Sequence, residues 1–277
     1  MLRPLLLVSL ALGGCSRKAD APSELATTAV ESGSPSETPN FPLVPDPIAI
    51  QVGSANVVIA IDLAKLDIAE LSPMVPEGLD CVRGLLGKVG VVVLALGEHS
   101  QGFVTGMPED ATIKCITELA PLLGATTRPA GDAFQVVIGG DTYAIRWGKD
   151  GVTTIRDEAH PMKIAAPTPK LVALIKQVPR DSEGWMVSGG WPKLKITSSV
   201  AWIKSEKDSW HLVVTANGSE PGVAASWLAS IPRGFKQGAA AKGVVVDDSW
   251  FKVTNANAMS ARLDGNIPSD LITRPEP

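Results

Sequence analysis

The residues that most often carry catalysis are few and widely spaced in this chain. Its three histidines, His99, His160 and His211, form no HExxH pair, the spacing with which one helix binds zinc. No GxSxG nucleophile motif occurs. Ser249 and Lys252 match S-x-x-K, but that pair cooperates on a helix. The sequence predicts a strand here, on which residues three apart point to opposite sides. We therefore expect no catalytic residues and a non-enzymatic protein, an enzyme being the less favoured alternative.

Acidic and sulfur ligands also lack the spacing of a metal site. Asp247-Asp248 is typical of an exposed turn between strands, and the calcium pattern D-x-[DN]-x-[DN]-G is absent. Besides Cys15 there are only Cys81 and Cys115, whereas a structural zinc site takes four ligands in paired spacing. We expect no metal and no cofactor.

The amino terminus indicates a different chemistry. Met1-Leu2-Arg3 is a basic start, residues 5–12 are apolar apart from Ser9, and Leu12-Gly13-Gly14-Cys15 places small residues before a cysteine. This order is typical of a secretion signal. The apolar run is shorter than the ~20 residues that a membrane-spanning helix needs.

Leu12-Gly13-Gly14-Cys15 resembles the lipobox of bacterial prolipoproteins at each position. The resemblance covers residues 1–16 and implies cleavage before Cys15, a diacylglycerol on its thiol and acylation of the new amino group. A single acyl chain binds membranes only marginally, so two or three are needed for stable anchoring. In the sorting rule known for such proteins, aspartate after the cysteine retains the protein at the inner membrane. Ser16 therefore favours the outer membrane, facing the periplasm or the cell surface. The alternative is an ordinary signal peptide with a chance cysteine.

Export from the cytoplasm would allow the two remaining cysteines to form a disulfide. An even pair in an oxidising compartment favours one disulfide, between Cys81 and Cys115. Separate buried thiols remain the alternative.

The amino-acid composition limits which classes of binding partner are expected. The net charge of −4 argues against nucleic acid and against a basic membrane-binding surface. A hydrophobic content of 45% is sufficient for a globular core. The lipid anchor is then the membrane partner, and another envelope protein or the cell wall is the expected macromolecular partner.

The chain divides into five predicted segments. Residues 1–14 form the signal peptide, and residues 15–48 form the lipidated cysteine with a Pro/Ser-rich tether that cannot bury enough apolar surface to fold. The stretch 41–47 is expected to be extended because of its prolines. Residues 49–165 and 166–270 form two α+β modules, and 271–277 is a tail. In this organisation the chain is similar to bacterial lipoproteins that carry an extracytoplasmic domain on a proline-rich tether.

The first module shows the order β-α-β-β-α followed by more strands. This order predicts a ferredoxin-like, split β-α-β sheet with its helices on one face. Cys81 and Cys115 would then lie on neighbouring helices, where Cα atoms within about 7 Å allow a bond. The predicted strands are 56–62, 89–96, 101–106, 134–138, 142–147 and 152–155, and the predicted helices are 79–86 and one opening at Pro108.

The second module predicts an antiparallel sheet with helices on one face. Thr168-Pro169 is typical of a helix start, with an N-cap followed by proline at the first position. The predicted helices are the one opening at Thr168, 222–231 and 258–263, and the predicted strands are 183–188, 197–204, 209–215, 244–246 and 250–254.

Six of the seven tryptophans fall in the second module. If Lys204 pairs with Ser209 across a turn, Trp202 pairs with His211 on one side of the sheet, and Ile203 and neighbouring apolar residues face the helices on the other. Trp202 and His211, together with Trp191 at a loop tip, are therefore a possible binding surface. The alternative is that these rings only stabilise packing, and a second functional candidate is a cell-wall or glycan-binding module that uses the tryptophans.

Overall fold

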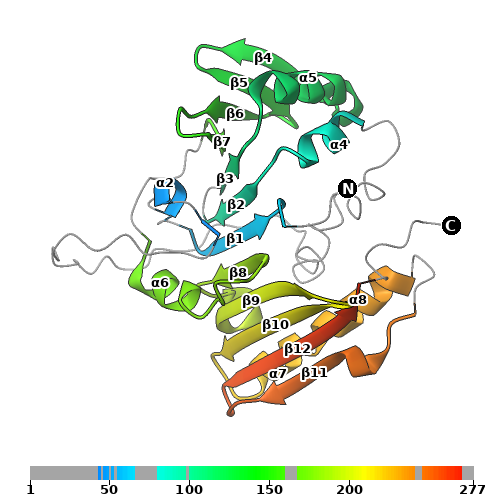
Figure 1. Cartoon of the computed structure of the whole chain (residues 1–277). Helices are drawn as coiled ribbons and strands as arrows, with labels where there is room; N and C mark the ends of the chain where they lie inside the picture. The colour runs from blue at the N-terminus through cyan, green and yellow to red at the C-terminus, as the bar shows by residue number, and fades with distance from the viewer. Residues whose placement is uncertain are drawn as a thin grey trace, which may run out of the picture.

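The computed structural model of the chain describes residues 43–44, 46–49, 51–52, 55–65, 80–97, 100–159, 167–240 and 245–269. Twelve strands in these residues form one antiparallel sheet in the order β11-β12-β10-β9-β8-β1-β2-β3-β7-β6-β5-β4 (Figure 1). The strands are β1 (Val57–Asp62), β2 (Val91–Leu96), β3 (Ser100–Thr105), β4 (Thr126–Ala130), β5 (Ala133–Ile138), β6 (Asp141–Trp147), β7 (Val152–Asp157), β8 (Gly184–Ser188), β9 (Ile196–Glu206), β10 (Ser209–Gly218), β11 (Phe251–Asn255) and β12 (Ser260–Pro268).

The helices are short and lie outside the sheet. They are α2 (Asp46–Ala49), α4 (Asp80–Leu86), α5 (Glu109–Leu119), α6 (Pro169–Ile175), α7 (Val223–Leu228) and α8 (Ser230–Ala240). Three 3-10 turns accompany them: η2 (Ala120–Leu123), η3 (Pro192–Leu194) and η4 (Asp248–Trp250). The prediction of a mixed α and β protein built on an antiparallel sheet is thus confirmed.

The centre of the sheet joins the two halves of the chain. β1 pairs with β2 along Val57↔Leu96 and with β8 along Val57↔Ser188. Because β1 and β8 are hydrogen-bonded neighbours, one sheet continues through both predicted modules, and two separate tandem modules are not confirmed. The ferredoxin-like arrangement is not confirmed either, because β1 lies directly beside β2 as an antiparallel partner. In a split β-α-β unit another strand separates these two.

The packed part of the chain begins earlier than predicted. Val44 is 5% exposed and Ile48 is 0% exposed, and both belong to the main core. The stretch 41–47, expected to be extended, overlaps α2, whose proline at position 47 is compatible with the first turn of a helix. The boundary predicted at residue 49 therefore lies at least five residues too late, since Val44 and Ile48 supply apolar surface to the core.

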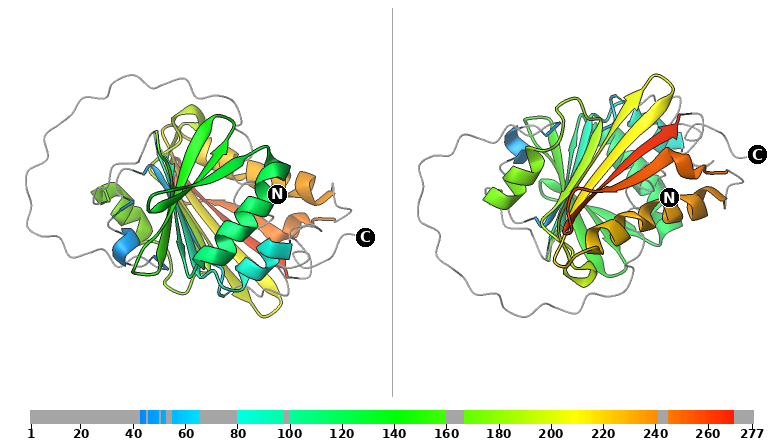
Figure 2. Two further views of the ribbon diagram at one scale, coloured as in Figure 1. Left: turned by 90° about the horizontal axis from the view of Figure 1, so that it is seen from above. Right: turned by 90° about the horizontal axis from the view of Figure 1, so that it is seen from below.

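The two sides of the sheet carry different helices. Figure 2 shows α2 and α6 on one side, called the α2 side below, and α4, α5 and α8 on the other, called the α8 side. On the α2 side, Ile48 and Ile175 share a core with Val58 of β1. On the α8 side, Leu228 of α7 shares a core with Leu263 of β12. The expectation that the helices of the second half lie on one face is wrong, because α6 and α7 pack on opposite sides.

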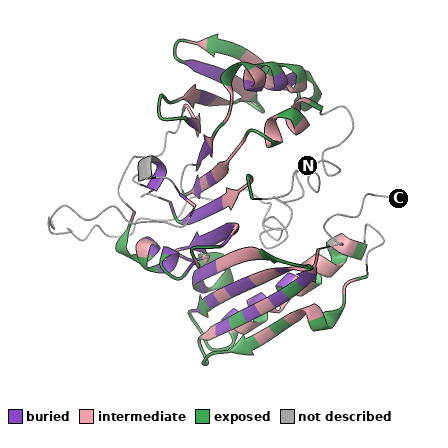
Figure 3. Cartoon of the chain, viewed as in Figure 1, coloured by how far each residue is buried: buried purple, intermediate pink, exposed green. Residues whose placement is uncertain are grey.

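The carboxyl-terminal region differs from its prediction. Residues 258–263 were expected to be helical, but Ser260–Pro268 forms β12. Ala261, Leu263, Gly265 and Ile267 are buried in alternation, and the residues between them are more exposed (Figure 3). That period of two fits a strand with one covered face. Of the predicted strand 244–246, the structure describes residues 245 and 246, and neither is in a strand. The predicted helix 222–231 corresponds to α7 and to the start of α8, which extends to Ala240.

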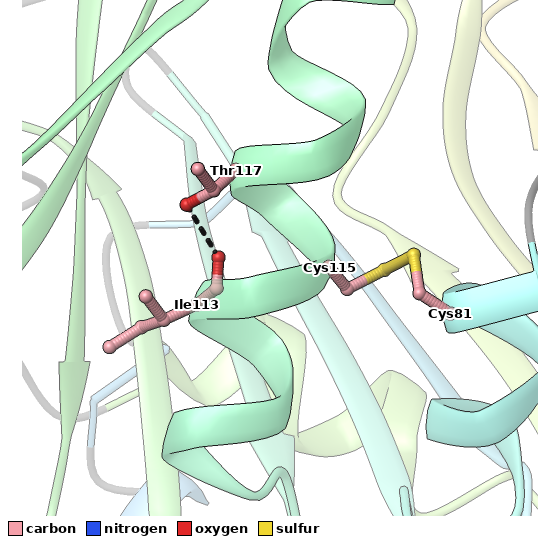
Figure 4. The surroundings of a disulfide bond; sticks show 4 residues. All are labelled: Cys81, Ile113, Cys115 and Thr117. Atoms are coloured by element: carbon pink, nitrogen blue, oxygen red, sulfur yellow. Dashed lines mark hydrogen bonds between the residues drawn. A yellow bond between two sulfur atoms is a disulfide. The ribbon is translucent and has the colours of Figure 1, made fainter.

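The predicted disulfide joins α4 to α5. Cys81 and Cys115 are bonded, with their Cα atoms 5.2 Å apart (Figure 4). Cys115 lies within α5, where the hydroxyl of Thr117 donates a hydrogen bond to the Ile113 carbonyl 2.8 Å away. Both cysteines lie on neighbouring helices as expected, so a covalent bond ties α4 to α5 on the α8 side.

Candidate functional site

Strands β9, β10 and β12 present different residues to the two sides of the sheet. Trp202 lies opposite Val213, which in turn lies opposite Asp264, so these three side chains share the α2 side. The same register places Thr215 and Arg262 there. We call this surface the polar face; it consists of Trp202, Lys204, His211, Thr215, Arg262 and Asp264.

The polar face is open to solvent, whereas the other side of the same strands is covered. The side chain of His211 is 33% exposed, and that of Arg262 is 44% exposed. On the α8 side the same strands contribute Val214, Ala216 and Leu263 to a buried cluster with α7. Figure 2 shows α7 and α8 along that covered side. The apolar side of this hairpin thus meets helices, as the alternation predicts, and the other side carries partly exposed side chains.

Trp202 and His211 are in contact, but not as direct cross-strand partners. The hairpin closes through Lys207-Asp208, so Glu206 pairs with Ser209 and Lys204 pairs with His211. The predicted Lys204–Ser209 pairing is therefore two residues out of register, which preserves the side of each residue but changes its partner. Trp202 meets His211 diagonally, with ring centroids 5.2 Å apart and an interplanar angle of 82°.

Trp202 lies at the border between the polar face and the core. Its ring is partly buried and packs against the cluster that contains Trp185 and Val200. Trp202 also lies directly opposite Trp185 across the β8–β9 pair. Trp202 thus contacts both the core under α2 and α6 and the ring of His211.

His211 lies between two carboxylates. Its Nδ1 is 3.8 Å from Glu206 Oε1, and its Nε2 is 3.8 Å from Asp264 Oδ1. Arg262 binds the same Asp264 carboxylate with two nitrogens, Nε at 2.9 Å and Nη2 at 2.6 Å. These hydrogen bonds hold the pKa of Asp264 below its ordinary value, although burial partly opposes the shift, and they raise the pKa of Arg262.

A second ion pair lies at the end of the polar face near β8. Lys204 Nζ donates to Asp181 Oδ2 at 2.5 Å. This hydrogen bond lowers the pKa of Asp181 and raises that of Lys204. Both groups are exposed, so water screens the pair and it contributes little to stability. The polar face thus displays charges of both signs around the Trp202–His211 contact.

Trp191 does not belong to the polar face. Its ring packs against the cluster of Val57, Ile59 and Met186 on the α8 side, and its Nε1 donates to Ser199 Oγ at 3.4 Å. The structure therefore brings Trp202 and His211 together but separates Trp191 from them by the thickness of the sheet. For Trp191 the structure favours the packing alternative, since a bridge to Ile196 holds its backbone beside the strands.

The charged partners of His211 on β12 were missed by sequence reasoning. Arg262 falls in the predicted helix 258–263 and Asp264 directly follows it, so the sequence assigns neither to a strand face. The alternation of Ala261, Leu263, Gly265 and Ile267 was the available signal. This alternation is a weak signal because two of its four residues, Ala261 and Gly265, are too small to indicate a buried strand face.

Several predicted features lie outside the described residues. They are the signal peptide, Cys15, most of the tether, His99 and His160. Within the described ranges, no group of three or more His, Cys, Asp and Glu side chains could hold a metal ion. None of the helices that the structure describes is both long and apolar enough to cross a bilayer.

The sequence matches no protein-family model, and no curated protein shows a significant match. Among solved structures, crystal form III of TP0453 is similar with a TM-score of 0.46 and 11% identity, covering 78% of this chain and 91% of that chain. Crystal form I of TP0453 gives a TM-score of 0.47 and 10% identity, covering 80% of this chain and 93% of that one.

Proposed function

We propose that this chain is a lipid-anchored protein of the bacterial envelope that binds another envelope protein through the polar face and catalyses no reaction. The anchor rests on the lipobox-like residues Leu12 to Cys15. The outer membrane is the proposed site because Ser16, rather than aspartate, follows the cysteine. The disulfide between Cys81 and Cys115 supports an oxidising compartment, where such bonds persist.

One observation carries the binding role: beyond the core contact of Trp202, the described helices that cover these strands, α7 and α8, lie on the side opposite His211. Tryptophan and arginine are enriched where one protein contacts another, and polar side chains form the rim of such contacts. The charges on the polar face are already paired, Arg262 with Asp264 and Lys204 with Asp181. Pre-organised side chains lower the entropy cost of binding a partner.

The second candidate function, glycan binding, is less favoured because none of the tryptophan side chains is fully exposed. Trp185 is 3% exposed and Trp210 is 8% exposed, and the other five are only partly exposed. A sugar stacks on a flat, exposed ring, whereas Trp202 is partly buried against the core and meets His211 in a T-shaped contact. We retain cell-wall binding as the alternative that the experiments must separate.

Metabolic labelling with palmitate tests the anchor. The full-length chain should incorporate label, and Cys15→Ala should abolish it, whereas the matched variant Ser16→Ala should label normally. Labelling retained in Cys15→Ala would remove the anchor from the proposal.

Site-specific cross-linking tests the polar face. A photoreactive amino acid at position 254, whose Thr254 lies opposite Arg262 on the edge strand, should give adducts of defined mass in cells. The same group at the exposed position 233 on α8 is the control and should give none of these adducts. Equal adducts from both positions, or none from position 254, would contradict a specific contact through the polar face. Adducts only with peptidoglycan would instead support the second candidate.

A further inference from the structure

A row of aligned residues, polar except for the buried Ala144, crosses the opposite end of the sheet on strands β4 to β7 and β3. Arg128 lies opposite Gln135, Gln135 opposite Ala144, Ala144 opposite Arg156, and Arg156 opposite Gln101. Directly opposed residues point to the same side, so this row shares one side of the sheet. Through Ala95 and Val58 the row continues to the core under α2 and α6, which identifies its side as the α2 side.

Hydrogen bonds already organise part of this row. Arg128 Nε donates to Gln135 Oε1 at 2.6 Å, and Gln135 Nε2 donates to Glu158 Oε2. Arg146 Nη2 donates to the other Glu158 oxygen at 3.2 Å. Arg146 lies on the same side as Arg156, because it pairs with Thr154, two residues earlier on β7. The network therefore holds the side chains of two arginines, from β4 and β6, in place on one surface.

The positive charge of this surface is only partly neutralised. Arg156 has no hydrogen-bond or ion-pair partner in the part of the chain that the structure describes. Arg146 Nη1 is buried without a partner, although Arg146 Nε lies 3.5 Å from the carboxylate of Asp132. Of the three arginines, only Arg146 contacts carboxylates in the described residues, those of Asp132 and Glu158, and the Asp132 side chain is 85% exposed. The Arg146 side chain as a whole is 27% exposed, so its accessible part can contact a ligand although Nη1 cannot.

The spacing of the arginines favours an extended ligand over a single small anion. β4 and β7 are three strand spacings of about 4.8 Å apart, so Arg128 and Arg156 are separated by roughly 14 Å. Alternate side chains of an extended peptide lie about 7 Å apart on one side, so three alternate positions span this distance. The planar guanidinium fork matches a carboxylate with two parallel hydrogen bonds.

We propose that Arg128, Arg146 and Arg156 bind the carboxylates of an acidic segment, rich in Asp and Glu, of a partner protein. The ligand lies across β4 to β7 on the α2 side, in the direction of the Arg128–Gln135–Arg156 row. This site is separate from the polar face, because α2 and α6 cover the sheet between the two surfaces. It therefore stands whether or not the polar face binds a partner.

Fluorescence anisotropy with a labelled hexaglutamate peptide tests the site. The full-length chain, purified in an uncharged detergent, should bind this peptide at about 10 mM NaCl and lose it at about 300 mM, because salt screens exposed charges. A labelled hexaglutamine peptide should not bind. Equal binding of both peptides, or no binding of hexaglutamate at low salt, would overturn the proposal.

Single substitutions locate the bound peptide. Arg156→Gln should weaken hexaglutamate binding about three- to tenfold, as expected for the loss of one charge-assisted contact at a partly exposed site. Arg128→Gln combined with Arg156→Gln should weaken it further. Arg233→Gln on the α8 side is the matched control, because Arg233 is exposed and has no partner in the described residues. Arg262→Gln tests the alternative that hexaglutamate binds at the polar face.

Thermal unfolding of the same variants shows whether a loss of binding arises from misfolding. Arg156 makes no hydrogen bond or ion pair in the described residues, so Arg156→Gln should leave the thermal unfolding midpoint unchanged. Weaker binding with an unchanged midpoint supports the site. Binding that is equally weakened in Arg233→Gln, or weakened only in Arg262→Gln, contradicts it.

Discussion

Trp202 and His211 meet in a T-shaped contact, 5.2 Å between ring centroids, although each faces a different residue across the β9–β10 pair. Trp202 lies opposite Val213, and His211 lies opposite Lys204. The contact is therefore diagonal, within the reach of aromatic side chains on neighbouring strands. It connects the core under α2 and α6 to the charged side chains of β12.

The two rings should contribute unequally to stability. Trp202→Ala removes a large, partly buried side chain from the edge of the core, so we expect the free energy of unfolding to fall by about 2–3 kcal/mol. His211→Ala removes mainly the ring contact and should cost less than about 1 kcal/mol. Urea unfolding followed by far-UV circular dichroism measures both. Equal losses would mean that Trp202 packs on the core less than the structure indicates.

The disulfide should stabilise the fold by constraining the unfolded chain. Cys81 and Cys115 are separated by 34 residues, for which loop-closure entropy predicts about 3–4 kcal/mol. Dithiothreitol should lower the free energy of unfolding by about this amount in the wild-type chain. The Cys81→Ser/Cys115→Ser variant is the control: it should start at the lower stability and not respond to the reductant. A response in that variant would show that the effect arises elsewhere.

The Arg262–Asp264 pair should make stability depend on acid pH. Asp264 has a lowered pKa in the folded state, so its stabilising contribution is fully present above the unfolded-state value of about 3.9. That contribution is lost as the pH falls through the lower folded value. The stability difference between the wild-type chain and Arg262→Gln should therefore be larger at about pH 6.5 than at about pH 3. Arg233→Gln should show no such difference, and a pH-independent effect of Arg262→Gln would contradict the assigned interaction.

The segment around α2 should be required for stability. Ile48 is 0% exposed in the main core, so Ile48→Ala should reduce the free energy of unfolding by about 2–4 kcal/mol. Leu122→Ala is the control, because Leu122 is 73% exposed and its truncation should change stability by less than about 0.5 kcal/mol.

Truncation gives an independent check on α2. A chain that starts at residue 43 should keep the stability of the full-length chain, and one that starts at residue 50 should be clearly less stable. Equal stability of the two truncated chains would show that the tether includes residues up to 48, as the sequence predicts.

Local features were predictable because their causes are local. The strand at Val57–Asp62 follows from a continuous apolar, β-branched run, and the β5–β6 hairpin follows from Gly139-Gly140, which both adopt positive φ. The start of α6 follows from Thr168, whose Oγ1 accepts a hydrogen bond from Leu171 N at 3.2 Å. Each of these signals lies within a few residues of the structure that it specifies.

The composition of the candidate site was only partly predictable. Alternation along β9 and β10 correctly assigned Trp202 and His211 to one side and Ile203 to the other. Their true partners depend on a two-residue turn at Lys207-Asp208 that the sequence does not mark with glycine or asparagine. Arg262 and Asp264 were missed because alanine and glycine occupy half of the buried positions of β12.

The sequence by itself determined where most strands and helices form, the likeness of Leu12 to Cys15 to a lipobox, and the two cysteines that can bond. Only the tertiary structure decided that β1 pairs with β8 and so makes one sheet of both halves. Only the tertiary structure decided which charges surround His211 and which arginines align from β4 to β7. The physical reason is that pairing between distant strands depends on the burial and hydrogen bonding of the whole sheet, whereas periodicity and capping act within a single segment.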